Sequence, residues 1–181
     1  MITGGKPYLP VAAENSIPVS NAGCVLIHSY FPMLFERLGL MAGQSFANED
    51  ARQSAVHYLQ YVITGLSYTE ENNLSLNKVL CGVPMAQHTT DGILMPENHV
   101  ELINGMINAI IGYWPAIGAC SVDGFRGNWL VRDGLLTEFD DKWELAIEKR
   151  AYDVLINKAP FAFSIIKHPW MNKPLHVNWP Y

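Results

Sequence analysis

The spacing of apolar residues changes along this 181-residue chain, and the change limits the folds that it can adopt. After Pro96, apolar residues recur every three or four positions, which is the period of a helix with one buried face. Residues 135–148 instead alternate between apolar and polar, which predicts a hairpin with its turn at Asp140 and Asp141. We therefore predict an α+β fold, with mainly helical N-terminal two-thirds packed with a small antiparallel C-terminal sheet. The helical stripe after Pro96 consists of Val100, Ile103, Ile107, Ile110, Ile111 and Trp114.

Further helices are predicted from capping residues and periodicity. One starts near Ser29, because Pro32 is tolerated only in a first turn, and residues 24–27 before it are expected to be extended or looped. Another covers residues 49–64, with Asn48 as its side-chain cap. Shorter helices are predicted over residues 74–81, 122–131 and 152–157, and short strands over residues 163–167 and 175–178. The residues of these strands that we expect to point into the core are Phe163, Ile165 and Val177.

The domain organisation follows from composition. Residues 1–20 contain glycine and proline without helical or strand periodicity, which predicts a linker or leader lying on the surface. Residues 21–181 are predicted to form a single α+β domain, since 49% of the chain is hydrophobic and its length suits one sizeable core.

The charge balance excludes some classes of partner. With 12 basic and 17 acidic residues, the chain lacks the excess of lysine and arginine that binds nucleic-acid phosphates. No apolar run approaches the roughly 20 residues of a membrane-spanning helix, and residues 1–10 do not resemble a signal peptide. Only 16% of the residues are charged, which suggests that a partner covers part of the surface. An uncharged polar surface on a monomer explains the same composition.

The residues form no convincing catalytic, cofactor or metal site. Cys24 and His28 are four residues apart, as a thiol nucleophile and its base would be on a helix, but Pro32 places the helix after Cys24. The three cysteines are widely spaced, which does not indicate a disulfide framework, and the histidines have no metal-binding spacing. No phosphate-binding loop is present. We therefore expect no catalytic residue, no metal and no cofactor.

The last fifth of the chain combines apolar runs, prolines and tryptophans with little charge. Aromatic side chains of this kind either pack within the domain or anchor a partner, because they dominate interface energetics. The residues that we predict to bind a partner are Trp170, Met171, Trp179 and Tyr181.

Several blocks, read in order, resemble the C-terminal region of tape measure proteins of contractile injection systems. The blocks are NAGCVLIHSYFPMLFERLGL (21–40), AVHYLQYVITG (55–65), LNKVLCGVP (76–84), WPAIGACSVDGFRGNWLVRDG (114–134) and WELAIEKRAYDVLINKAPFAFSIIKHPWMNKPLHVNW (143–179). Such proteins are expected to be considerably longer, with a helical ruler segment, and no rod-forming repeat occurs here.

The resemblance implies a structural role without catalytic residues, in support of inner-tube length control. It implies docking to the tube, the hub or baseplate, or the cap, with self-association also open. The charge balance and the short apolar runs predict no contact with nucleic acid or membrane. The location would be the bacterial cytoplasm during assembly and then the assembled particle. Two alternatives stay open: a thiol-dependent hydrolase or effector cargo that uses Cys24 or Cys81 with a histidine, and a small peptide- or glycan-binding module.

Overall fold

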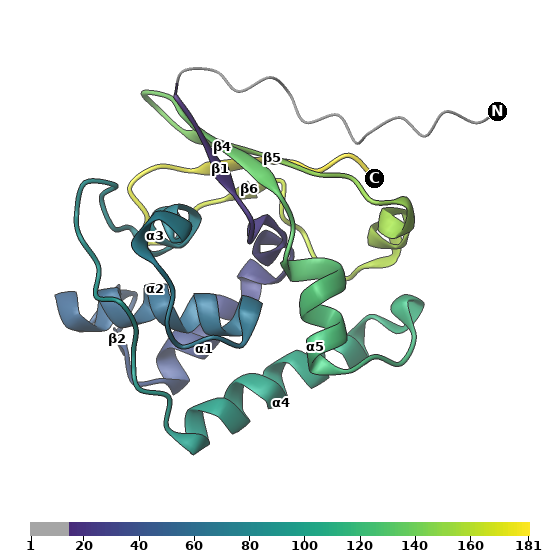
Figure 1. The fold of residues 1–181 in the computed structure, drawn as a ribbon, viewed down its shortest axis with the longest axis horizontal. Helices are drawn as coiled ribbons and strands as arrows, with labels where there is room; N and C mark the ends of the chain where they lie inside the picture. Colours follow the sequence, from purple (N-terminus) through teal and green to yellow (C-terminus); the bar gives the residue numbers. More distant parts are fainter. Residues whose placement is uncertain (1–14) are drawn as a thin grey trace.

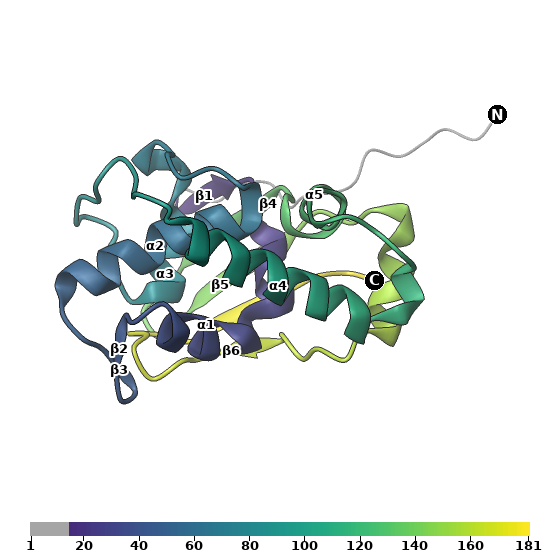
Figure 2. The same ribbon diagram turned by 90° about the horizontal axis from the view of Figure 1, so that it is seen from below.

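A mixed sheet forms one side of the molecule and helices cover the face that carries its core residues (Figure 1 and Figure 2). The structure, a computed structural model, describes residues 15–181. The sheet has five strands in the order β1-β4-β5-β7-β6. The strands are β1 (Ser16–Val19), β4 (Gly134–Glu138), β5 (Trp143–Ile147), β6 (Ile165–Ile166) and β7 (Leu175–Asn178). An α+β fold is thus confirmed. A separate pair of short strands, β2 (Met41–Ala42) and β3 (Ser45–Phe46), follows the first helices.

The predicted hairpin is confirmed as β4 and β5. Leu136 lies opposite Leu145, and both side chains are fully buried, whereas their neighbours Thr137 and Glu144 are opposite each other on the outer face. The sheet, predicted to be antiparallel, is mixed, because β7 runs parallel to β5. A parallel neighbour needs a long crossover, and residues between β5 and β7 supply it.

The prediction of a linker over residues 1–20 is wrong for β1. This strand pairs antiparallel with β4, from Ser16 opposite Thr137 to Val19 opposite Gly134. Pro18 hides the strand in the sequence, but an edge strand tolerates proline because one row of its N–H groups faces away from the sheet. Residues 1–14 of the predicted linker lie outside the described residues.

The first helical segment departs from the prediction at its start. Instead of extended chain, residues 22–30 form a 3-10 helix, η1 (Ala22–Tyr30), which is kinked at Ile27. The α-helix α1 (Phe31–Arg37) follows, with Pro32 in its first turn as predicted. Every residue from Ala22 to Ile27 is buried, so this stretch has no one-sided apolar pattern from which a helix could have been recognised.

The long helices agree with the prediction. Helix α2 (Glu49–Thr64) starts at Asn48, whose side chain accepts a 2.8 Å hydrogen bond from the Ala51 N–H, and ends at Gly65 with a φ of 74°. Helix α4 (Glu97–Tyr113) follows Pro96. The shorter helical elements are η2 (Glu71–Asn73), α3 (Ser75–Cys81), η3 (Pro115–Ile117), α5 (Val122–Phe125), the π-helical turn η4 (Arg126–Leu130) and η5 (Ala151–Lys158).

The terminal strands only partly match the predicted orientations. Phe163 is buried and Val177 is half-buried, but Ile165 is 62% exposed. Because successive strand residues point to opposite faces, the fully buried Ile166 forces Ile165 outward.

Candidate functional site

The structure places the four predicted partner-binding residues in two different environments. Trp170, Met171 and Trp179 are buried, whereas Tyr181 is 50% exposed. The first three side chains therefore pack within the domain and do not offer their surface to a partner. We call the last fifth of the chain, which carries all four residues, the tail. Tyr181 is the one of the four that offers exposed surface.

Trp170 attaches the tail to the helical layer. Its indole N–H donates a 2.8 Å hydrogen bond to the carbonyl oxygen of Leu80, near the end of α3. Its ring stacks on His168 at a centroid distance of 4.8 Å and packs against Phe35 and Phe46. Met171 lies beside it, and its sulfur accepts a hydrogen bond from the His168 N–H. The tail is thus part of the core.

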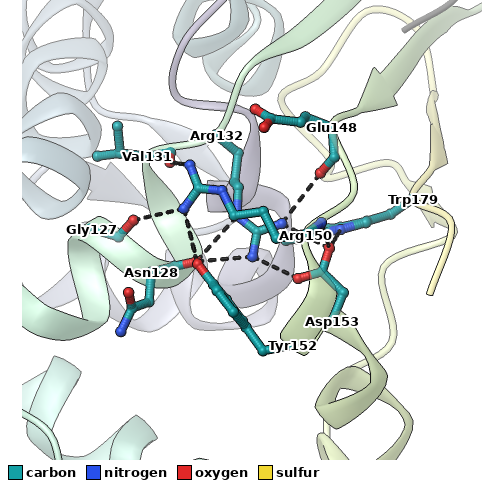
Figure 3. Close-up of polar contacts among 9 residues, drawn as sticks. All are labelled: Gly127, Asn128, Val131, Arg132, Glu148, Arg150, Tyr152, Asp153 and Trp179. Carbon is teal, nitrogen blue, oxygen red and sulfur yellow. Dashed lines mark hydrogen bonds and ion pairs between the residues drawn. The ribbon is translucent and has the colours of Figure 1, made fainter. Parts of the chain in front are cut away.

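Trp179 enters a buried polar cluster at the opposite end of the tail, which we call the Arg132 node. The node consists of Arg132, Asp153, Trp179 and the backbone groups that they contact (Figure 3). The indole N–H of Trp179 donates to Asp153 Oδ2 at 2.9 Å. Arg132 and Asp153 are both fully buried, so each must find its polar partners inside the protein.

All five N–H groups of Arg132 have acceptors. Two donate to the Asp153 carboxylate, at 2.8 and 2.6 Å, and the others donate to the carbonyl oxygens of Asn128 and Glu148. The guanidinium also lies 5.1 to 5.5 Å from the ring centroids of Trp129, Tyr152 and Trp179. The ion pair with Asp153, the hydrogen bonds to carbonyl oxygens and the aromatic faces together stabilise the buried guanidinium.

Asp153 remains a carboxylate in this environment. Burial by itself would raise its pKa, but hydrogen bonds from Arg132, the Arg150 N–H and Trp179 outweigh burial and lower the pKa. An acidic group whose pKa is lowered and whose oxygens are occupied by donors is not a general acid or base. The Arg132 node therefore joins segments of the chain and has no catalytic arrangement.

Arginines also occupy the carboxyl ends of helices elsewhere. Arg150 donates to the carbonyl oxygens of Gly127 and Val131, at the end of η4. Arg126 donates to those of Tyr61 and Val62, in the last turn of α2. Carbonyl groups at helix ends lack partners within the helix and carry the negative end of the helix dipole, so a guanidinium satisfies both needs.

His28, four residues after Cys24, contacts a backbone carbonyl and another histidine. His28 Nε2 donates to the Ala162 carbonyl oxygen at 2.8 Å, and His28 Nδ1 lies 3.2 Å from His168 Nε2. Burial raises the pKa of both Cys24 and Cys81, whose side chains are fully withdrawn from solvent. The geometry therefore gives no support to a thiol-dependent hydrolase that uses these cysteines.

Within residues 15–181, no three His, Cys, Asp or Glu side chains converge to hold a metal ion. No helix in that range combines the length and apolar character needed to cross a bilayer.

Sequence reasoning missed Arg132, Asp153 and Arg126. Nothing in the spacing of Arg132 and Asp153 distinguishes them from solvated charges, because their partners are backbone carbonyls and a carboxylate brought together by the fold. Composition identified the tryptophans as candidates, but it did not show whether they pack within the domain or contact a partner.

The contacts define a structural domain in which buried polar groups serve to join chain segments. Comparison with protein families identifies it further: the chain belongs to the contractile injection system tape measure protein family, whose model matches residues 8–179. The resemblance seen in the sequence blocks is thereby confirmed. No curated protein and no solved structure gives a significant match.

Proposed function

We propose that this chain is a non-enzymatic assembly domain that supports control of inner-tube length by docking to tube, hub or cap components of the injection particle. The family match carries this proposal, because it covers almost the whole described fold and includes the terminal segment held by the Arg132 node. Assembly takes place in the bacterial cytoplasm, and the domain then remains in the particle.

The proposed contact surface is the exposed C-terminal end of the chain. The Tyr181 ring lies 6.1 Å from the ring of the buried Phe163, which packs 5.7 Å from Trp179. Ile165, two residues further along, adds an exposed apolar side chain on the edge strand β6. A tyrosine supported by rigid aromatic neighbours loses little conformational entropy when it binds a protein surface. In this proposal Trp170, Met171 and Trp179 position the end of the chain, and Tyr181 makes the contact.

The first experiment removes the segment equivalent to residues 21–179 from the particle-forming system. We expect particles that are absent, truncated or scattered in length, as measured on tubes and sheaths in electron micrographs. Particles of normal length that lose only their effect on target cells would overturn the proposal and favour an effector cargo.

A second experiment tests the surface without disturbing the core. Tyr181→Ala should broaden the length distribution or reduce particle yield, whereas Val154→Ala should not. Val154 is 62% exposed on η5 and is a control for loss of an exposed apolar side chain. Equal particle lengths and yields for both variants would count against the Tyr181 surface.

A further inference from the structure

A groove lies between α1 and α4, and both helices stand in front of the sheet in Figure 2. This α1–α4 groove has a volume of about 430 Å³. Its apolar lining includes Met33, Leu102 and Met106. Met33, at 37% exposed, and Tyr113, at 66% exposed, leave apolar surface in water at its margin. Covering apolar surface of this kind with a protein partner lowers the free energy of the system.

The two walls of the groove run in opposite directions. Tyr30 immediately precedes α1 and Tyr113 ends α4, yet both line the groove, and Figure 2 shows α1 and α4 running in opposite directions. The end of α1 therefore lies toward the start of α4. Arg37 and Glu101, which also line the groove, consequently stand on opposite walls at its other end.

These two charges are available to a partner. Arg37 and Glu101 are both exposed, and within residues 15–181 neither side chain takes part in an ion pair. A groove with one charge of each sign on opposite walls is complementary to itself. A two-fold axis along the groove exchanges its walls and keeps its ends, so Arg37 would face the partner's Glu101 and Glu101 would face the partner's Arg37.

We propose that the α1–α4 groove binds the same groove of a second copy of this chain. Gly105 and Ala109 are exposed on α4, and a Cβ atom added at Gly105 would meet no atom within 4 Å. This open stretch of the α4 wall lets a helix of the second copy approach closely. The unbranched side chain of Met33, which is 37% exposed, can adjust to fill the contact. The pairing goes beyond the proposed function, since it needs no other particle component.

The test uses the full chain alone and measures its mass by sedimentation over a wide range of concentrations. The unmodified chain should form a dimer. Arg37→Glu and Glu101→Arg each place like charges across the groove twice, and each should raise the dimer dissociation constant by roughly 10-fold or more. The double variant Arg37→Glu with Glu101→Arg restores both pairs with exchanged signs and should restore the dimer.

Two further variants make the result specific. Lys149→Glu makes the same change of charge as Arg37→Glu at an exposed residue outside the groove and should leave the dimer intact. Ala109→Arg places a large side chain on the α4 wall of the groove and should abolish the dimer without altering Arg37 or Glu101. Circular dichroism checks that each variant is folded.

A chain that is monomeric at every concentration would overturn the pairing, as would a dimer that neither single reversal weakens. Particle length measured with Arg37→Glu separates this proposal from the proposed function. A monomeric chain whose removal still scatters particle length would overturn the pairing and leave the assembly role standing.

Discussion

The side chains of Arg132 and Asp153 form a fully buried ion pair with two hydrogen bonds, and they connect three distant parts of the chain. Arg132 follows η4 and Asp153 lies in η5. Trp179, the residue after β7, donates a hydrogen bond to the Asp153 carboxylate. Because burying two charges costs about as much as their attraction returns, such a pair contributes little net stability as a whole. Removal of one partner leaves the other charge buried without compensation.

We expect Arg132→Met to lower the free energy of unfolding by about 3–5 kcal/mol, for this reason. Urea denaturation monitored by tryptophan fluorescence measures the change. Lys142→Met provides the control, since Lys142 pairs with Glu144 on the outer face of the sheet, where both are partly exposed. Its cost should stay below about 1 kcal/mol. Similar losses of unfolding free energy for the two variants would contradict the view that burial makes the Arg132 ion pair more sensitive to removal of one partner than an exposed pair.

The His28 and His168 pair should make the protein less stable in mild acid. Burial, followed by the charge of its neighbour His28, lowers the pKa of His168 to about 4, and burial also lowers the pKa of His28. Between about pH 6.5 and pH 4 the unfolded chain binds protons at these residues that the folded chain does not. Stability should therefore fall as the pH falls through this window.

The measurement compares free energies of unfolding at neutral pH and near pH 5. His168→Phe removes the titrating group and keeps an aromatic ring against Trp170, so its stability should depend less on pH than that of the unmodified chain. An unchanged pH dependence in this variant would show that other groups cause it.

Gly82 should be more sensitive to substitution than Gly39, although both have a positive φ near 75°. A Cβ atom at Gly82 would lie 2.1 Å from the carbonyl oxygen of Trp170, whereas one at Gly39 would meet no atom within 4 Å. Gly39→Ala thus measures backbone strain alone, at about 1 kcal/mol. Gly82→Ala adds a collision with the backbone of Trp170. It should therefore lower the stability, measured by thermal denaturation, clearly more than Gly39→Ala does. Equal costs would mean that the tail moves away from α3 easily.

Alkylation should distinguish the three thiols. Cys24 and Cys81 are buried, and burial raises their pKa values, whereas Cys120 is only partly buried. Iodoacetamide should therefore label the folded protein at Cys120 first and label all three cysteines after unfolding, as mass spectrometry would record. Rapid labelling of Cys24 or Cys81 in the folded chain would revive the thiol-dependent enzyme as an alternative.

The helices with clear end signals were predictable from sequence alone. Helix α2 agrees because its cap at Asn48 and its terminating Gly65 act through local contacts within the same few residues. The β4–β5 hairpin agrees because alternation is also a local property. Strand β1 and helix η1 were missed, since Pro18 interrupts one pattern and uniform burial removes periodicity from the other.

The sequence by itself determined the element types apart from β1 and η1, the α+β class and the family, because these depend on periodicity, caps and ordered blocks of residues. Only the tertiary structure decided that β7 runs parallel to β5, that Trp170 and Trp179 face inward, and that Arg132 meets Asp153. These features join residues far apart along the chain. Local patterns do not encode them, because the free energy of burying a tryptophan or pairing a charge depends on which distant groups surround it.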